Sequence, residues 1–480
     1  MMRKQVTLSL LILAMLASAC GQESTSGKDT TAAQNSDTST PTETEISDDL
    51  PDTLNFEGKE LRILTSKDTK HSPVLVEEQI GEVVNDALWV RNEKVSERFG
   101  ITMSESVLIW SEARDTARNT ITSGDDAYDL ISLIDREAVN CVIEGMFYPV
   151  EDVQYIDLSK PYWIQSMNEN LTLGGRQLLA YSSMMMTVYD FTYVMLFNKQ
   201  LIEDMQLESP YDLVENGTWT LDNFNKYAQA GVSDLNGDLA YDMEDQYGIT
   251  SVPRQFSPCV WIASDCLTIE KDSDDLPIYS MNNERMLDVL TFAHELTGAG
   301  NIWFKQQHSD YTSHRTLFTS GQSLFTCDSF GNLFKEEYRA MTANYGLIPF
   351  PKFDEEQDSY YSRVEGGSPY MVPVTLEDTS FSGAMLEALS CESYNSVLPD
   401  YYDVALKVKL TRDEQSMRIL DEIMENRVYD WGDTIFSNYI RDGFVVRAIV
   451  AGNPVAASDI EANRSKVEAA IDKVVTAFTK

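Results

Sequence analysis

The chain has 480 residues, with 37 Lys or Arg against 77 Asp or Glu, so its formal net charge is -40 at pH 7. Nucleic acid is excluded as a ligand, because such an acidic surface would repel phosphates instead of neutralising them. The same acidity weakens the case for a polyanionic substrate.

The first twenty residues have the pattern of an export signal. Arg3 and Lys4 precede an apolar run from Leu8 to Leu16, and small residues lead up to Cys20. This run is shorter than the roughly 20 residues that span a bilayer, so we predict a cleaved signal peptide over residues 1–19. No later run is apolar for long enough to cross a membrane.

A cysteine at the cleavage point resembles the lipobox of bacterial lipoproteins, whose thiol carries acyl chains such as palmitate. Ala17 departs from that pattern, because the usual Leu lies one residue earlier, at Leu16. The alternative is an ordinary signal followed by an unrelated cysteine. The resemblance implies a lipid anchor on Cys20. The polar residues after it cannot bury enough surface to fold, so we assign residues 20–56 to the anchor and a disordered tether.

Strand and helix patterns alternate after the tether. Leu61 to Thr65, Ile101 to Ile109 and Tyr128 to Asp135 read as strands. Apolar residues at helical spacing, up to Phe99 in the first interval and around Ala117 in the second, predict a helix between each pair. This βαβαβ order predicts a parallel sheet with both faces covered.

Ligands of such sheets bind beyond the carboxyl ends of the strands, which here are Ser66, Trp110 and Asp135. Trp110 is either a platform for a ligand or a loop aromatic that packs on its own lobe. Asp135 is either a ligand contact or a helix cap.

The alternation continues in the second half of the chain. The run from Val188 to Lys199 is rich in β-branched and aromatic residues and predicts a strand, and Thr220 is placed to cap a helix. Apolar runs after Gly321 and from Tyr345 predict further strands. Periodic apolar residues from Ile460 to Phe478 predict a helix at the end of the chain.

The cysteines and histidines show no clear disulfide pattern and no clear metal-binding pattern. Apart from Cys20, the cysteines are irregularly spaced; Cys259 and Cys266 are close enough in sequence to pair, and buried free thiols are the alternative. The four histidines are scattered, so we expect no transition-metal site and no required cofactor.

One acidic loop has the spacing of a calcium site. Its oxygen ligands, at the first, third, fifth, seventh, ninth and twelfth positions, would be Asp234, Asn236, Asp238, the carbonyl of Ala240, Asp242 and Asp245. Leu239 stands where such loops have Gly, and Asp245 is shorter than the usual Glu. A structural calcium is one interpretation and an acidic surface turn is the other.

Four stretches together resemble the sugar-binding family of ABC importers that is related to maltose-binding protein. They are Tyr128-Asp129-Leu130 with Gly145 and Pro149-Val150; Ala180-Tyr181 through Phe197-Asn198-Lys199 to Trp219-Thr220; Gly321-Gln322; and Tyr345-Gly346 with Pro349 and Pro351. Each is weak alone, but their order and spacing span most of residues 57–375.

The resemblance implies an α/β fold of the two-lobed periplasmic-binding-protein type (type II), with a hinge between the lobes. By analogy the chain crosses between lobes near Ala180-Tyr181 and near Gly366-Gly367. The first lobe would comprise residues 57–180 and 371–425, and the second lobe residues 181–370 and 426–480.

A sugar site needs aromatic plates for the apolar ring faces and fixed polar groups for the hydroxyls. The candidate plates are Trp110, Tyr181, Trp261, Phe330 and Trp431, and the candidate polar partners are Asp135, Asp190, Asp328, Arg363 and Glu365. Asp190 follows the first crossing, where the family often contacts its ligand. Core packing is the alternative for each aromatic residue.

The resemblance further implies a monomeric binding protein, not an enzyme, anchored at the extracellular face of the cell membrane. It would capture an oligosaccharide or a related neutral solute and deliver it to the transmembrane subunits of an ABC permease. The rival hypothesis is a membrane-tethered glycoside hydrolase, which needs two carboxyl groups about 5 to 9 Å apart. No catalytic motif in the sequence favours that hypothesis.

Overall fold

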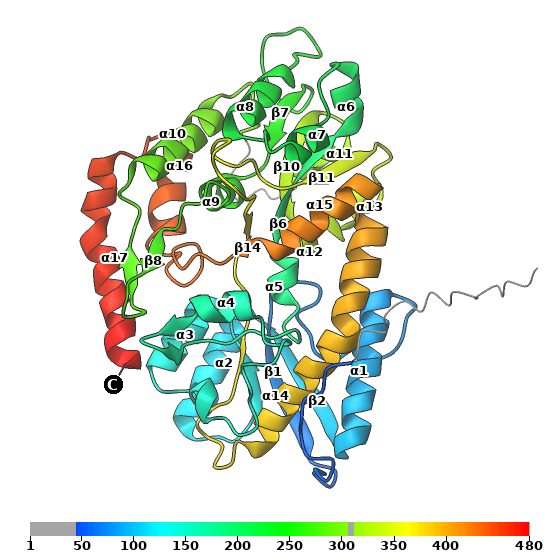
Figure 1. The fold of residues 1–480 in the computed structure, drawn as a ribbon, viewed down its shortest axis with the longest axis vertical. Helices are drawn as coiled ribbons and strands as arrows, with labels where there is room; N and C mark the ends of the chain where they lie inside the picture. Colours follow the sequence, from blue (N-terminus) through cyan, green and yellow to red (C-terminus); the bar gives the residue numbers. More distant parts are fainter. Residues whose placement is uncertain (1–44, 306–311, 480) are drawn as a thin grey trace, which may run out of the picture. The chain divides into compact units, whose positions relative to one another are not determined.

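Two separate four-stranded sheets organise the computed structural model, which describes residues 45–305 and 312–479 (Figure 1). Each sheet and the helices around it make an α/β lobe, and we call them the first and second lobe in chain order. The predicted signal peptide, Cys20 and the tether up to residue 44 lie outside the described residues.

The first lobe is built on the sheet β13-β3-β1-β2. β1 (Glu60–Lys67) pairs in parallel with β2 (Thr102–Ile109) and β3 (Leu130–Ser132), and β13 (Tyr370–Met371) joins β3 in the antiparallel direction. The helices that follow these strands are α1 (Val83–Phe99), α2 (Trp110–Ser123) and α3 (Asp135–Ile143). The predicted βαβαβ unit is confirmed.

In helix α1 the sequence explains both why the helix forms and where it ends. Val84, Leu88, Val95 and Phe99 recur at helical spacing and are all buried. The helix ends at Gly100, whose φ of 61° lies in the left-handed region and whose N–H donates to the carbonyl of Ser96. Glycine adopts that conformation at little cost, so it ends the helix and frees the chain to enter β2.

The second lobe is built on the sheet β11-β6-β10-β7. β6 (Tyr193–Asn198) is antiparallel to β10 (Ser323–Ser329) and to β11 (Tyr345–Ile348), and β10 is parallel to β7 (Tyr247–Thr250). The helices of this part are α6 (Lys199–Asp204), α7 (Pro210–Glu215), α8 (Leu221–Ala230), α9 (Pro253–Ala263), α10 (Glu284–Gly298), α11 (Ser313–Thr319), α12 (Phe330–Leu333) and α13 (Glu336–Arg339). Thr220 caps α8 as predicted, its hydroxyl accepting from the backbone N–H of Asn223 at 3.4 Å.

The strand predicted from Val188 begins later than expected. Residues Thr187–Asp190 form a short helix, α5, and the strand β6 starts only at Tyr193. Every residue of α5 is buried. A continuous buried run carries no periodicity that separates helix from strand, which is why the sequence did not show this boundary.

Three neighbouring segments connect the lobes. The backbone N–H of Glu365 donates to the carbonyl of Phe191, and that of Val364 donates to the carbonyl of Val428, each at 3.0 Å. Two short strands, β12 (Ser362–Arg363) and β14 (Arg427–Val428), pair in parallel at the same place. We call these the crossing segments.

Tyr181 lies before the first crossing segment. Its carbonyl accepts from the N–H of Ile164, and its own N–H donates to the side chain of Asn168, so it is still held within the first lobe. The first crossing is therefore later than predicted. Gly366 and Gly367, where we expected the second crossing, follow β12 after Val364 and Glu365. The remaining lobe boundaries stay predictions.

Several further elements join or flank the lobes. They are the 3-10 turn η1 (Val150–Asp152), α4 (Gln165–Asn170), β4 (Thr172–Leu173), β5 (Arg176–Gln177), β8 (Ile269–Lys271), β9 (Pro277–Tyr279), α14 (Ser380–Glu392), the π-helical η2 (Ser393–Val397) and η3 (Asp400–Leu410), α15 (Glu414–Glu425), π-helical η4 (Arg441–Val445), α16 (Val446–Val450) and α17 (Ala457–Phe478). The terminal helix α17, red in Figure 1, packs against α3 of the first lobe and against β9.

The predicted tether ends earlier than residue 56. Leu50 is buried, Asp48 pairs with Arg98, and the ring of Phe56 packs against that of Phe381 at 4.8 Å between centroids. These apolar and charged side chains attach residues 46–56 to the first lobe. The polar composition that indicated a tether does not extend to them.

All five cysteines of the described residues are buried and free, so Cys259 and Cys266 do not pair. Burial raises the pKa of Cys141 to about 11 and that of Cys266, Cys327 and Cys391 to about 12. Among the described residues, every helix is too short or too polar to cross a bilayer.

Candidate functional site

A cleft between the lobes contains two adjoining pockets that share Asp68 and Phe191. The first, which we call the tryptophan pocket, has a volume of about 300 Å³. Its first-lobe wall is formed by Asp68, Trp110, Ile134, Asp135 and Arg136. Its other walls are formed by Phe191, Glu365 and Gly367 of the crossing region and by Arg254, Asp433, Thr434, Ser437 and Arg441.

The second pocket, which we call the lysine pocket, has a volume of about 420 Å³. The loop after β1 supplies Lys67, Asp68, Thr69 and Lys70, and the segment around α12 supplies Ser329, Gly331, Asn332, Phe334 and Lys335. Both pockets therefore lie beyond the carboxyl ends of parallel strands of the first sheet, where ligands of such sheets bind.

Trp110 is the exposed aromatic side chain of the cleft. It is the first residue of α2, directly after β2, and 39% of its surface is exposed. The guanidinium of Arg136 lies 5.1 Å from the ring centroid and that of Arg114 lies 5.5 Å from it. These cation–π contacts orient the indole while leaving part of it open to a ligand.

Asp135 begins α3, is buried, and forms part of the first-lobe wall of the tryptophan pocket. One carboxylate oxygen accepts from the hydroxyl of Tyr181, and the other accepts from the N–H of Gly367 at 2.8 Å. Burial raises the pKa of Asp135 to about 7, although both hydrogen bonds lower it. A Cβ on Gly366 would lie 2.1 Å from this carboxylate, so only glycine fits there.

We expect Asp135 to make the protein less stable as the pH rises from about 4 to about 7. The pKa of this carboxyl is about 7 in the folded chain and about 3.9 in the unfolded chain. Within that window the folded state holds a proton that the unfolded state has released, so its stabilising contribution is lost through the folded pKa.

The substitution Asp135→Asn keeps a neutral group and removes this proton. Relative to the parent, the variant should gain free energy of unfolding between about pH 5 and about pH 8, measured by urea denaturation at each pH. A difference between variant and parent that is the same at both pH values would contradict the assignment.

Glu365 belongs to a dense ionic network on the opposite wall. Its carboxylate accepts from Arg254 at 2.7 Å, from Arg441 at 3.3 Å and from the hydroxyl of Tyr193 at 2.6 Å. Burial alone would raise the pKa of Glu365, but the guanidinium groups of Arg363, Arg254 and Arg441 outweigh it and lower the pKa. This side chain is ionised and fixed in place, as a hydrogen-bond acceptor for a ligand must be.

No protein-family model and no curated protein sequence matches this chain. Solved structures do match it. A cyclo/maltodextrin-binding protein in complex with maltotetraose matches with a TM-score of 0.56 at 12% identity, over 88% of this chain and 97% of that chain. The maltose/maltodextrin-binding domain from Bdellovibrio bacteriovorus, bound to maltotriose, gives 0.54 at 16% identity over 86% and 99%. An ABC substrate-binding protein from Listeria monocytogenes, in complex with cycloalternan, gives 0.56 at 12% identity over 86% and 99%.

The chain has the two-lobed fold of ABC sugar-binding proteins. The fold predicted from the four sequence stretches is thereby confirmed. In this two-lobed fold, Trp110, Asp135 and Glu365 are the predicted site residues that line the cleft.

Three other predicted polar partners are buried and bound to other side chains within the two-lobed fold. Asp190 lies 2.9 Å from the ring Nδ1 of His71 and accepts from the hydroxyl of Tyr401. Asp328 pairs with Arg315 at 2.6 Å. Arg363 pairs with Asp433, also at 2.6 Å. The structure does not bring these three side chains to either cleft pocket.

The other aromatic residues that were predicted to stack against a ligand do not line either cleft pocket. Tyr181 is buried behind Asp135, and Phe330 is buried after β10. Trp261 is buried in α9, with its indole N–H on the carboxylate of Asp430. Trp431 lines a separate cavity beside β8, and its indole N–H donates to the carbonyl of Asn170.

Sequence reasoning missed several charged residues of the cleft, namely Lys67, Asp68, Lys70, Arg136, Arg254, Lys335 and Arg441. For Lys67, Asp68 and Arg136 a signal was present, because each lies within two residues of the predicted strand ends Ser66 and Asp135. Arg254, Lys335 and Arg441 carried no such signal, since only the fold brings them to the cleft.

The acidic loop of residues 234–245 satisfies its carboxylates internally. Asp234 accepts from the N–H groups of Gly237 and Leu239, and Asp245 accepts from those of Leu235 and Asp242. Leu239 adopts a φ of 64°, in the left-handed region that favours glycine. Within residues 45–305 and 312–479, no group of three His, Cys, Asp or Glu side chains is placed to hold a metal ion. Calcium binding at this loop stays a prediction.

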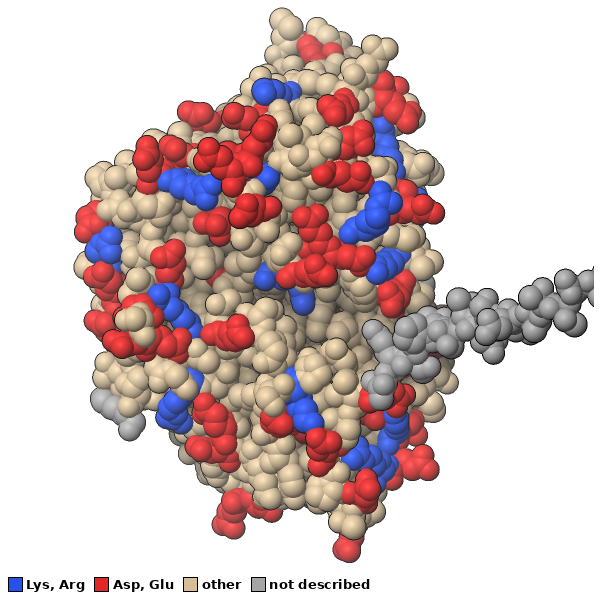
Figure 2. Space-filling model, viewed as in Figure 1, with Lys and Arg blue, Asp and Glu red and all other residues tan. Residues whose placement is uncertain are grey.

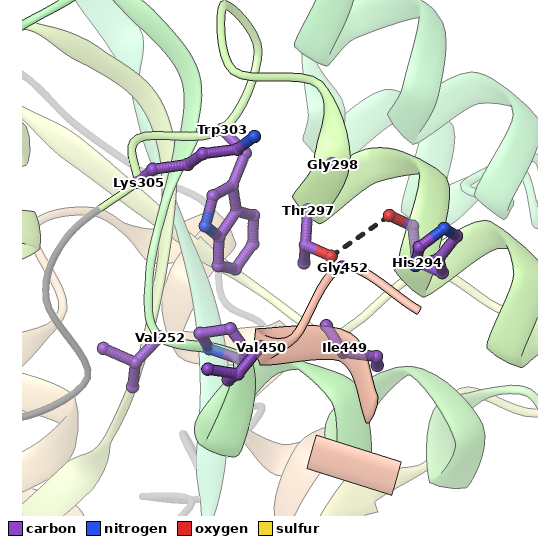
Figure 3. Close-up of a pocket in the computed structure, with 10 residues that line it drawn as sticks. Val252, His294, Thr297, Gly298, Trp303, Lys305, Ile449, Val450 and Gly452 are labelled. Atoms are coloured by element: carbon purple, nitrogen blue, oxygen red, sulfur yellow. Dashed lines mark hydrogen bonds between the residues drawn. The ribbon is translucent and has the colours of Figure 1, made fainter. Parts of the chain in front are cut away.

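A further cavity of about 210 Å³ lies in the second lobe, away from the cleft (Figure 3). Val252, Trp303, Ile449 and Val450 give it a largely apolar lining, and the hydroxyl of Thr297 donates to the carbonyl of His294 at its edge. It shares no residue with the two cleft pockets.

Proposed function

We propose that this chain binds an oligosaccharide, or a solute of similar size and polarity, in the cleft between its lobes. The observation that carries the proposal is the tryptophan pocket, where a half-exposed indole stands beside fixed carboxylate and guanidinium groups. A saccharide offers an apolar ring face and a rim of hydroxyls, and these two kinds of surface match the two parts of the pocket.

The solved structures support the proposal. Three proteins with the same fold are bound to maltotetraose, maltotriose and cycloalternan. Their ligands are saccharides of several units. The joint volume of the two adjoining pockets in this chain gives room for more than a single ring.

We infer that the bound solute is delivered to the transmembrane subunits of an ABC permease. The protein would act as a monomer anchored by Cys20 at the extracellular face of the cell membrane. Closure of the lobes around the crossing segments would present the loaded form, because only a difference in ligand affinity between open and closed forms couples binding to delivery.

Asp135 is the observation that favours the rival hydrolase. A carboxyl group whose pKa is raised to about 7 is suited to donate a proton to a leaving group. However, both of its oxygens already accept hydrogen bonds, from Tyr181 and from Gly367. We therefore expect the saccharide to leave the cleft intact, which chromatography of the ligand after overnight incubation will check.

A thermal-shift screen of oligosaccharides, followed by calorimetry of the hits, tests the proposed function. For a saccharide that binds, Trp110→Ala should weaken affinity about tenfold or more, because the ring loses its stacking partner. The melting temperature should stay close to that of the parent, since the indole is half exposed.

The matched control is Ile109→Ala, which removes an adjacent, 54% exposed apolar side chain that lines neither cleft pocket. It should leave the affinity unchanged. Equal affinities of the parent and the Trp110 variant would remove the indole from the site, and an absence of any saccharide hit would overturn the proposed function.

A further inference from the structure

In the lysine pocket basic side chains outnumber acidic ones, whereas acidic side chains predominate in the chain as a whole. Over the whole sequence Asp and Glu outnumber Lys and Arg by 77 to 37, and acidic side chains are spread over the face shown in Figure 2. The lysine pocket instead has three ammonium groups, on Lys67, Lys70 and Lys335, against one carboxylate, on Asp68.

Two of these ammonium groups lack the carboxylate partners that arginines of the cleft have. In the tryptophan pocket, Arg254 pairs with Glu365 at 2.7 Å and Arg441 pairs with Asp442 at 2.9 Å. Within the described part of the chain, by contrast, Lys67 and Lys335 form no ion pair with any carboxylate.

The third ammonium group is only weakly paired. That of Lys70 has one carboxylate near it, Glu82 at 3.7 Å, and both side chains are partly exposed. Exposed pairs of this length contribute little, so the ammonium group remains available to a ligand.

The single carboxylate of the pocket, on Asp68, already has a hydrogen-bond partner. Asp68 accepts from the hydroxyl of Ser368 at 2.6 Å, and burial raises its pKa. The opposite holds for Lys335, whose pKa is lowered by burial and then by the nearby guanidinium of Arg315. Lowering of the Lys335 pKa means that its charged form is disfavoured in the empty pocket, and an anion placed between the lysines would stabilise that form.

We propose that the solute is an acidic saccharide, whose carboxylate or sulfate group binds in the lysine pocket while a ring lies against Trp110. The inference rests on the proposed function and adds a ligand class to it. The shared residues Asp68 and Phe191 make the two pockets continuous, so one molecule can occupy both. The expectation of a neutral solute, based on the charge of the whole chain, does not take account of this local reversal.

The first experiment measures binding of matched saccharides by calorimetry. The probes are oligomers of galacturonate, mannuronate and glucuronate, sulfated disaccharides, the methyl esters of the uronate oligomers, and neutral malto-oligosaccharides. We expect at least one acidic probe to bind, its methyl ester to bind about tenfold more weakly or worse, and its affinity to fall as salt is raised from about 0.02 M to about 0.5 M.

The second experiment uses the acidic probe that binds best. The double variant Lys67→Gln/Lys335→Gln should weaken its affinity about tenfold or more and leave the affinity for the methyl ester unchanged. The control is Lys226→Gln, which removes an exposed ammonium group on α8 outside the cleft, and it should have no effect. Both variants change surface side chains, so a melting temperature equal to that of the parent shows that each is folded.

The outcomes separate the two proposals. Neutral saccharides that bind as tightly as acidic ones, with no response to the double variant, would overturn the acidic ligand and leave the saccharide function standing. If no saccharide of either class binds, both proposals fail. A preference for sulfated over carboxylated probes would identify the anionic group while supporting the inference.

Discussion

Arg363→Met is expected to lower the free energy of unfolding by about 3 to 5 kcal/mol. The Arg363 guanidinium makes two hydrogen bonds to the carboxylate of Asp433, at 2.6 and 2.9 Å, and both side chains are 0% exposed. Methionine fills much of the same volume but leaves a buried carboxylate with fewer partners. Urea denaturation of parent and variant measures the loss.

The double variant Arg363→Met/Asp433→Asn provides the control. Because it removes the unpaired charge as well, it should recover a substantial part of the stability, even though Arg441 also loses a partner in Asp433. A single variant as stable as the parent, or a double variant no better than the single one, would show that the pair does not stabilise the crossing segments.

Trp261→Ala is expected to cost about 3 to 5 kcal/mol of folding free energy. The indole is 0% exposed in α9, and its N–H donates to Asp430 at 3.1 Å. Alanine leaves a cavity and removes one donor from the carboxylate of Asp430, which keeps its hydrogen bonds from Thr268. Thermal and urea unfolding measure the loss, and calorimetry at a temperature where the variant is folded should show unchanged affinity for the saccharide.

The conservative change Trp261→Phe separates packing from the hydrogen bond. It retains most of the apolar volume and should cost about 1 to 3 kcal/mol, mainly for the lost hydrogen bond to the carboxylate of Asp430. This result would contrast with Trp110→Ala, which lowers affinity and spares stability. A loss of affinity in a folded Trp261→Phe variant would place this indole in the site, against its position in the structure.

Local patterns predicted the first lobe well. The spacing of Val84, Leu88, Val95 and Phe99 specified α1, and Gly100 specified its end. Trp110 and Asp135 were identified because a strand end is a feature of the sequence itself, and the fold places ligands there. These predictions needed no contact between distant parts of the chain.

Predictions that depend on distant partners were poorer. Asp328 and Asp190 are acidic residues beside strands, as site carboxylates often are, but inside the fold Arg315 pairs with Asp328 and the ring of His71 contacts Asp190. Nothing in the sequence around an aspartate states whether a cation will be packed against it. The lysine pocket shows the converse, since Lys67 and Lys335 come together only when two lobes are assembled.

The buried cysteines make the protein convenient to label. Thiols with a pKa near 11 or 12 are almost wholly protonated at neutral pH, and the protonated form is a poor nucleophile. A maleimide dye would therefore react with a cysteine introduced at an exposed site and spare Cys141, Cys266, Cys327 and Cys391. One dye on each lobe would report opening and closing by energy transfer in single molecules, without removing any native cysteine from the folded lobes.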